Sequence, residues 1–408
     1  MPPVPHTPPK TGDAPDVLDY ATKGQAVAAL EAWEQGRAVP EGGRAPAAPG
    51  PKAKPDRKGA VVGALFMAAV FASLLVYIEG SGRGPALMDA LGRVQAPWVW
   101  ATFAVMVAYL LFGTLAFVTT VAVTPDAPAG FLDLCSAEAA GTFFGNLTPM
   151  MAGAVPGQIW RLVKGGLGLG AAGAVQITRF LMFQTAEIVL GGALLALTWD
   201  RFYAQVGAVM FVNLFLFAFK AAQMAVLLAA CLFPDWVTKV ALSALDLVDR
   251  RSLFGLRSRT EGWRSSVRTQ VAQFSSTFRT AVRHRGAMAV MLAFSMAQQA
   301  CLWVSPWFVL GAFGIHQDPL VTCAAGSLVQ FVASSIPLPG GTGGVEASFA
   351  LFLGPVFGSA ATAGYLVWRL VTFYGYTALC GAATMVSTKP SSPTVRRRMR
   401  GLVERLGS

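Results

Sequence analysis

The stretch WVWATFAVMVAYLLFGTLAFVTTVAV, residues 98–123, contains no charged side chain. At a helical rise of about 1.5 Å per residue it can cross a hydrocarbon layer about 30 Å thick. Several such stretches follow one another, and the whole chain of 408 residues is 54% hydrophobic and only 13% charged, with a mean hydropathy of +0.53. This composition excludes a soluble enzyme and predicts an all-α, polytopic helical membrane protein.

Apolar segments long enough to be full spans number about six: 59–78, 98–123, 172–198, 203–232, 287–314 and 360–386. The N-terminus before them is polar and proline-rich, and the first apolar segment starts late and is long. We therefore expect no cleaved signal peptide, so that the first span stays in the mature protein. An even number of crossings puts both termini on the same side of the membrane.

Charge and composition divide the chain into three parts. Residues 1–58 hold 11 of the 25 prolines and are predicted to be a disordered tail, with a weak helix candidate at 17–35. Residues 59–386 form the transmembrane domain. Residues 387–408 form a basic tail, with six Lys or Arg against one acid. Lys and Arg collect on the inner side of membranes, so both termini are expected in the cytoplasm of a bacterial-type inner membrane.

The loop 235–285 is also basic, with ten Lys or Arg against four acids. Within it apolar residues recur at helical spacing between arginines, which predicts an amphipathic helix on an anionic lipid surface or against another cytoplasmic segment: Trp263, Val267, Val271, Phe274, Phe278 and Val282. Because no nucleic-acid-binding motif accompanies the charge, no nucleic-acid partner is expected. The five cysteines stand singly, so we expect no disulfide, metal site or cofactor.

Two further apolar segments are interrupted by proline and glycine. Residues 131–168 are broken near their middle at Asn146, Pro149, Gly153, Pro156 and Gly157. Residues 320–358 are broken by the run PLPGGTGG, which contains Pro337, Pro339, Gly340, Gly341 and Gly343. Broken backbone at membrane depth is tolerated only where protein or a water-filled cavity surrounds it. Each segment is therefore predicted to be a re-entrant helical hairpin at a functional interior.

The two predicted hairpins share a spacing. Nine positions separate Pro149 from Gln158, and nine separate Pro337 from Glu346. In each half an arginine follows inside the next span: Arg179 lies 21 positions after Gln158, and Arg369 lies 23 positions after Glu346. Three expected crossings lie between the hairpins, so they would enter from opposite sides. The pattern predicts an inverted repeat, an architecture of many transporters.

Four charges lie inside expected spans: Arg179, Glu187, Lys220 and Arg369. Each costs about 2.5–3.5 kcal/mol on insertion scales unless it is paired or hydrated, so they should gather with Glu346 around a polar interior. The arginines either pair with these carboxylates and fix packing, or face a cavity and bind an anion such as phosphate. Lys220 could instead snorkel.

The second arm of the later hairpin begins near Val345, which would direct free backbone N–H groups toward mid-membrane. An anion could bind there. Alternatively, the carboxylate of Glu346 in the first helical turn caps those N–H groups itself.

The sequence SIPLPGGTGGVEASF, followed by VWRLVTFYGY, resembles the signature of the lysylphosphatidylglycerol synthase transmembrane-region family of flippase-like membrane proteins. NLTPMMAGAVPGQIWRLVKGG, followed by ITRFLMFQ, resembles the first-half motif of the same family. The resemblance covers roughly residues 60–386 and implies a region that moves lipids between leaflets. In the synthases aminoacyl transfer resides in a separate soluble domain, which we expect this chain to lack.

The resemblance implies site roles in both halves: Asn146, Pro149, Gln158, Arg161 and Arg179 in the first, and Pro337, Pro339, Gly340, Gly341, Glu346, Arg369 and Tyr374 in the second. Gln158 occupies a position that is often acidic in relatives, and the turn before it lacks the expected double glycine. These departures argue against a proton-coupled carboxylate there.

We therefore expect a lipid transporter rather than an enzyme, recognising an anionic phospholipid or polyprenyl phosphate. Arg179 and Arg369 would hold the phosphate, while Glu346 and Glu187 would balance or gate them. A membrane-embedded lipid-modifying transferase is one alternative, although the sequence offers no evident acid–base pair. The other is a non-transporting scaffold, in which the arginines affect only stability. The oligomeric state is left open.

Overall fold

The computed structural model describes residues 16–34, 88–89, 91–124, 127–232, 278, 283–336, 339–341 and 343–406. These residues form helices joined by short turns, with no strand among them. The expected span at 59–78 and nearly all of the basic loop lie outside the described residues. The main elements are α1 (Lys23–Glu34), α4 (Ala96–Ala122), α5 (Phe131–Leu147), α6 (Ala154–Lys164), α7 (Leu169–Val206), α8 (Val209–Leu232), α11 (Arg285–Ala312), α12 (Pro319–Ser335), α13 (Gly344–Phe352), α14 (Gly354–Phe357), α15 (Ala361–Arg369), α16 (Tyr376–Ala383) and α17 (Val395–Leu406).

Short helical turns connect several of these elements: the 3-10 turns η1 (Val17–Asp19), η2 (Pro149–Met151), η4 (Pro339–Gly341) and η5 (Gly358–Ala360), and the π-helical turn η6 (Leu370–Gly375). The π-helical turn begins directly after Arg369 and joins α15 to α16. Turns of this kind occur frequently at functional sites.

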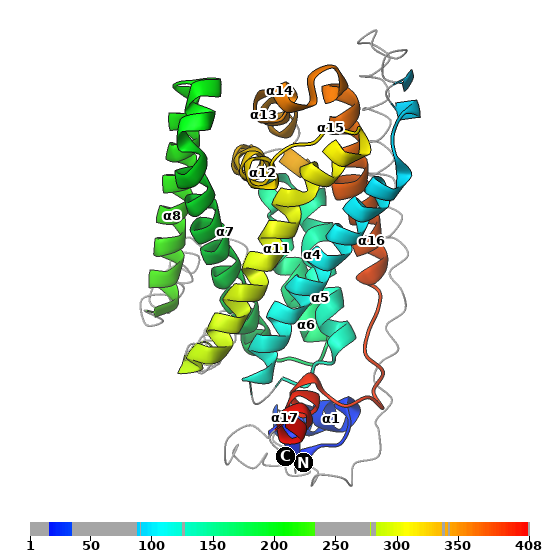
Figure 1. Cartoon of the computed structure of the whole chain (residues 1–408). Coiled ribbons are helices and arrows are strands. Elements are labelled where there is room, and N and C mark those ends of the chain that lie inside the picture. The colour runs from blue at the N-terminus through cyan, green and yellow to red at the C-terminus, as the bar shows by residue number, and fades with distance from the viewer. Residues whose placement is uncertain are drawn as a thin grey trace, which may run out of the picture.

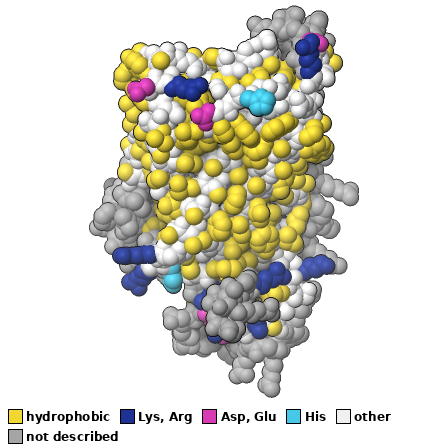
Figure 2. Space-filling view, viewed as in Figure 1, with side chains coloured by type: hydrophobic (Ala, Val, Ile, Leu, Met, Phe, Trp, Pro, Cys, Tyr) yellow, Lys and Arg dark blue, Asp and Glu magenta, His cyan; other side chains and the backbone are white. Residues whose placement is uncertain are grey.

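The described helices confirm an all-α, multi-pass membrane protein. Three of them, α4, α7 and α11, are long and apolar enough to cross a membrane, and α13 together with the helical run Gly354–Ala383 would add a fourth with a bend of 57°. On the face shown in Figure 2, hydrophobic side chains cover the middle of the bundle and charged side chains lie toward its two ends. Large apolar side chains are exposed on these helices, for example Trp100 on α4 at 71% and Phe215 on α8 at 67%. The described residues thus contain three or four candidate spans, fewer than the six expected from the sequence.

Proline and capping residues set several helix ends. α4 starts after Gln95 with a proline in its first turn, and α5 ends two residues before Pro149. α12 starts with Pro319, and the Oδ1 atom of Asp318 accepts a hydrogen bond of 2.8 Å from Leu320 N. Proline lacks a backbone N–H, so it fits the first helical turn and terminates a helix that precedes it.

Two helical hairpins approach each other inside the bundle. The first consists of α5 and α6 and starts at the end of the bundle where α1 and α17 lie; the second consists of α12 and α13, with α13 and α14 at the opposite end (Figure 1). Their turns η2 and η4 contact each other, and α5 also contacts η4. The chain thus breaks where proline and glycine predicted it, and the two breaks meet.

Residues 16–34 fold as η1 and α1, which confirms the helix candidate at 17–35 and limits the expectation of a disordered tail to the rest of residues 1–58. Lys23 Nζ lies 2.7 Å from Asp133 Oδ2 at the start of α5, and Lys23 N donates to the carbonyl of Ser392 at 2.9 Å. Several apolar side chains of the segment are buried together: Val17, Tyr20, Ala26, Ala29 and Leu30. Tertiary contacts that composition does not reveal therefore order this segment. We call the assembly of residues 16–34 and 386–396 on the base of the first hairpin the terminal clasp.

Candidate functional site

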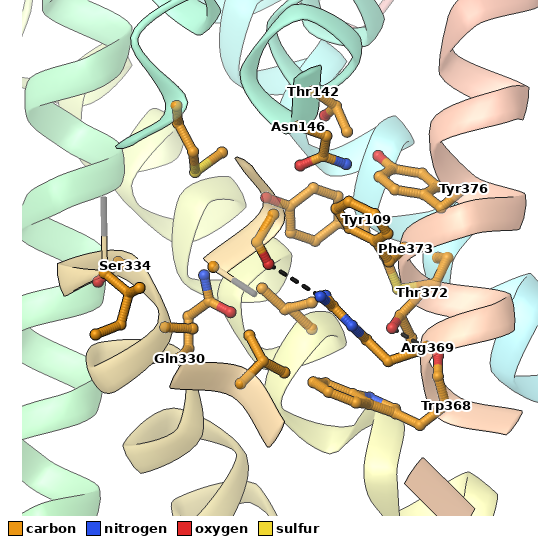
Figure 3. A pocket seen from close by; sticks show the side chains of 18 residues that line it. Tyr109, Thr142, Asn146, Gln330, Ser334, Trp368, Arg369, Thr372, Phe373 and Tyr376 are labelled. Carbon is orange, nitrogen blue, oxygen red and sulfur yellow. Dashed lines mark hydrogen bonds between the residues drawn. The ribbon is translucent and has the colours of Figure 1, made fainter. Parts of the chain in front are cut away.

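A cavity of about 130 Å³ lies where the turns of the two hairpins meet (Figure 3). Its walls come from both hairpins, from α4 and α11, and from the α15–η6–α16 run. The polar side chains that line it are Tyr109, Thr142, Asn146, Gln330, Ser334, Arg369, Thr372 and Tyr376. Of the side chains that the sequence marked as binding groups, Asn146 and Arg369 are present here.

Arg369 is the cation of this cavity and is only 7% exposed. Its Nη2 donates to the carbonyl of Gly340 at 3.0 Å, its Nε donates to the Tyr365 hydroxyl at 3.2 Å, and its guanidinium lies 4.3 Å from the ring centroid of Phe373. Among the described residues, no carboxylate forms a salt bridge with Arg369 and no group accepts from its Nη1. A buried cation without a counter-ion is unfavourable, so this guanidinium can stabilise an anion that enters the cavity.

Two tyrosines and an asparagine surround the same space. The Tyr376 side chain is 2% exposed, and its hydroxyl has no hydrogen-bond partner in the described part of the chain. Its ring packs edge-on against Tyr109, with the centroids 5.7 Å apart. Asn146 donates to Thr377 Oγ1 at 2.6 Å. Since a buried unpaired hydroxyl costs about 1–3 kcal/mol, the Tyr376 hydroxyl is a second group suited to a ligand.

Arg179 lies outside this cavity, in a buried polar cluster. Its Nη2 donates to Glu138 Oε1 at 2.8 Å and to Gln298 Oε1 at 2.7 Å, and it is 4% exposed. Gln298 Nε2 also donates to Glu138 Oε1, at 2.7 Å, and Gln158 Nε2 donates to Glu138 Oε2 at 3.3 Å. Arg179 is thus paired with a carboxylate, as the packing alternative expected, but this carboxylate is Glu138 rather than Glu187 or Glu346.

The other predicted side chains in the first half have protein partners as well. Glu187 on α7 forms an ion pair with Lys220 on α8, so Lys220 is paired and does not simply snorkel. Arg161 donates to Ser136 Oγ through Nε at 3.0 Å and through Nη2 at 2.6 Å. Neither the ion pair nor Arg161 lines the central cavity.

Glu346 caps α13. Its Oε2 accepts a hydrogen bond of 2.5 Å from Gly343 N, and its Oε1 accepts from the Tyr365 hydroxyl. This contact agrees with the alternative in which Glu346 caps the helix itself. Its carboxylate lies at the N-terminus of α13, where an anion could otherwise have bound. Tyr374 packs edge-on against Phe373 at 5.2 Å and is not part of the cavity wall.

The turn residues shape the cavity through the backbone. Gly340 and Gly341, both in the wall, have φ of +63° and +66°, a left-handed region that favours glycine. A Cβ at Gly340 would come closer than 3.0 Å to the Phe373 ring, so this turn needs glycine for space as well. Pro149 starts η2, Pro156 and Gly157 lie in the first two turns of α6, Pro339 starts η4 and Gly343 precedes α13, while Pro337 lies outside the described residues.

Sequence reasoning missed Glu138, Gln298, Tyr109, Gln330 and Tyr376. Glu138 did carry a signal, because it is an acidic residue within the apolar segment 131–147 and therefore required a cation. Its partner Arg179 is 41 positions away and Gln298 is 160 positions away. The tyrosines and glutamines carried no signal, since such residues are common at packed helix contacts.

The described residues contain no group of three or more His, Cys, Asp or Glu side chains arranged to hold a metal ion. A family model described as the lysylphosphatidylglycerol synthase TM region matches residues 61–380. The match includes every element from α4 to η6 and most of α16, and it leaves α1 and α17 outside. No curated protein and no solved structure matches the chain.

Proposed function

Because this chain belongs to the family of the lysylphosphatidylglycerol synthase TM region, an integral membrane family related to lipids, we propose that it moves an anionic lipid between leaflets without changing it chemically. The headgroup phosphate would bind in the central cavity. The substrate would be an anionic phospholipid or a polyprenyl phosphate, with its chains remaining in the hydrocarbon.

The observation that carries this proposal is the state of Arg369. Its guanidinium is buried in the cavity wall, held by Gly340 and Tyr365, and free of any carboxylate among the described residues. A guanidinium fork suits phosphate oxygens, and charge-assisted hydrogen bonds of this kind contribute about 1.5–3 kcal/mol. The cavity of about 130 Å³ is smaller than the roughly 300–1,000 Å³ of ordinary ligand pockets, as expected for a headgroup rather than a whole lipid.

The two hairpins contribute to the cavity in a related way, which supports an inverted repeat. Asn146 stands three positions before Pro149, and Ser334 stands three positions before Pro337; both line the cavity. Thr142 and Gln330, seven positions before the same prolines, line it as well. We propose that both hairpins are re-entrant and that the headgroup binds between their turns.

The same correspondence explains why one arginine is neutralised and the other is not. Eleven positions before Pro149 the first hairpin has Glu138, the partner of Arg179, whereas eleven positions before Pro337 the second hairpin has Gly326. Gly326 supplies no carboxylate, and an added Cβ would come closer than 3.0 Å to the backbone of Trp303. Arg369 is thereby left to bind an external anion.

The end of the bundle with the terminal clasp would face the cytoplasm of the inner membrane. α17 has Arg397 and Arg398 exposed at this end, and basic residues collect on the cytoplasmic side. The exposed arginines would also contact anionic lipid headgroups there.

Leaflet exchange of labelled lipids in reconstituted liposomes tests the function. We expect the wild type to accelerate the exchange of an anionic lipid, Arg369→Gln to abolish it, and Arg369→Lys to retain a part, since lysine keeps the charge without the fork. Arg93→Gln is the matched control, because Arg93 is an exposed arginine paired with Asp89 outside the cavity. Mass spectrometry of the recovered lipids distinguishes transport from modification. Unaccelerated exchange, or exchange untouched by Arg369→Gln in folded protein, would refute the proposal, and an altered lipid would indicate an enzyme.

A further inference from the structure

The Tyr365 hydroxyl stands between a carboxylate and the cavity arginine. It donates to Glu346 Oε1 and accepts from Arg369 Nε at 3.2 Å. Tyr365 precedes Arg369 by four residues on α15, so both side chains project from the same face of the helix. The other Glu346 oxygen accepts from Gly343 N at the start of α13. One hydrogen-bonded chain therefore connects the glycine turn of the second hairpin to the cavity cation.

The direction of each hydrogen bond in this chain is fixed by chemistry. The Nε–H of Arg369 can only donate, so the Tyr365 oxygen accepts from it and directs its own proton to Glu346 Oε1. The lone pairs of the hydroxyl are then available to the Nε–H of Arg369. Phe349 packs against the Tyr365 ring with centroids 5.3 Å apart, which holds the ring in place.

The indirect contact contrasts with the direct one in the first half of the chain. Glu138 contacts Arg179 at 2.8 Å, which neutralises that cation. Glu346 reaches Arg369 only through the Tyr365 oxygen, and the Nη1 atom of Arg369 has no acceptor among the described residues. Nε and Nη2 thereby fix the orientation of the guanidinium, while Nη1 stays without an acceptor among the described residues.

We propose that Tyr365 and Glu346 are positioning residues, which orient Arg369 toward the headgroup phosphate and leave its outer edge open. This inference rests on the proposed function of Arg369. Beyond that function, we infer that the affinity for the anion depends on Tyr365 and Glu346, although neither side chain touches the anion.

The test measures the exchange rate in liposomes as the mole fraction of labelled anionic lipid increases. Tyr365→Phe removes the bridging oxygen and keeps the ring. Glu346→Gln keeps an oxygen for Gly343 N but presents an amide donor to Tyr365, which reverses the hydroxyl toward Arg369. For each variant we expect half-maximal exchange to require about tenfold more lipid, with little change in the maximal rate. Because both changes break the same chain, the double variant should be little worse than either single one.

Tyr203→Phe is the matched control, because Tyr203 is 44% exposed on α7, away from the cavity. A purely structural role for Tyr365 would lower the thermal midpoint and the maximal rate together, with no change in the lipid fraction that gives half-maximal exchange. That result overturns the inference, and so does a double variant in which the effects of Tyr365→Phe and Glu346→Gln on half-maximal exchange simply add. If Arg369→Gln abolishes exchange while Tyr365→Phe and Glu346→Gln behave as wild type, the positioning role fails and the proposed function survives. If Arg369→Gln has no effect, the proposed function itself fails.

Discussion

Arg179 and Glu138 form a buried ion pair in which Nη2 lies 2.8 Å from Oε1, and this pair joins α7 to the first hairpin. Gln298 on α11 donates to the same carboxylate oxygen, so three helices converge on Glu138. The polar interior expected from the sequence is therefore divided into two parts. In one part the cation is neutralised by a carboxylate of the protein, although Arg179 Nε and Gln176 Oε1 have no partner among the described residues. In the other part, Arg369 forms no ion pair with a described residue.

Glu138→Gln is expected to destabilise the protein strongly, by about 3–5 kcal/mol, because Arg179 would remain buried without a counter-charge. Thermal unfolding in detergent measures the effect. Glu187→Gln is the comparison, since its partner Lys220 has a side chain 17% exposed and can recover some hydration, whereas that of Arg179 is 5% exposed. Equal losses from the two substitutions would contradict this account.

Gly113→Ala should disturb the same cluster from α4. A Cβ at Gly113 would come closer than 3.0 Å to the side chains of Glu138 and Gln298, so both would have to move. We expect a loss of about 1–3 kcal/mol, as for other overpacked sites. Gly286→Ala in α11 is the control, because no atom lies within 4 Å of its added Cβ. The control is expected to be neutral or slightly stabilising, and a similar loss from both would show that the close contact is irrelevant.

Tyr376→Phe separates stability from binding. The substitution removes a buried hydroxyl without a partner among the described residues, so the thermal midpoint of the lipid-free protein should stay the same or rise. If that hydroxyl binds the headgroup, the exchange of anionic lipid should slow by about tenfold. A lowered midpoint with unchanged exchange would assign the hydroxyl to packing.

Thiol labelling tests the orientation of the bundle. In a variant whose five native cysteines are replaced by alanine, His316→Cys and Ser391→Cys each place a thiol at an exposed position. Position 316 follows α11 and position 391 precedes α17; the end of α11 that leads to α12 and the helix α17 lie at opposite ends of the molecule (Figure 1). A membrane-impermeant maleimide should label the cysteine at position 316 in intact cells and the one at 391 only after permeabilisation. The reverse result would place the terminal clasp outside the cytoplasm.

Sequence reasoning located the breaks in the helices because proline and glycine act locally. The interruptions predicted around Pro149 and at PLPGG are the turns η2 and η4. It also identified Arg179, Glu187, Lys220 and Arg369 as charges that need compensation, since insertion energies depend on residue type and depth. Glu346 as a helix cap followed from its position in the first turn.

The partners of these charges could not be predicted, because they depend on which helix faces lie together. Apolar membrane helices have little periodicity, so the sequence does not show that Glu138 faces Arg179 or that Tyr365 lies between Glu346 and Arg369. A helix was expected within residues 17–35, but its tertiary contacts could not be predicted for a similar reason. Lys23 becomes buried only because Asp133, 110 positions later, lies opposite it.

The terminal clasp also imposes an order of events on biosynthesis. α1 is synthesised long before Ser392, yet Lys23 N donates to the Ser392 carbonyl and Gly24 N donates to the Pro390 carbonyl. These bonds cannot form until α16, which precedes both carbonyls in the sequence, has left the ribosome. The N-terminal segment can therefore close only after α4 to α16, which lie between the two partners in the sequence, have been synthesised.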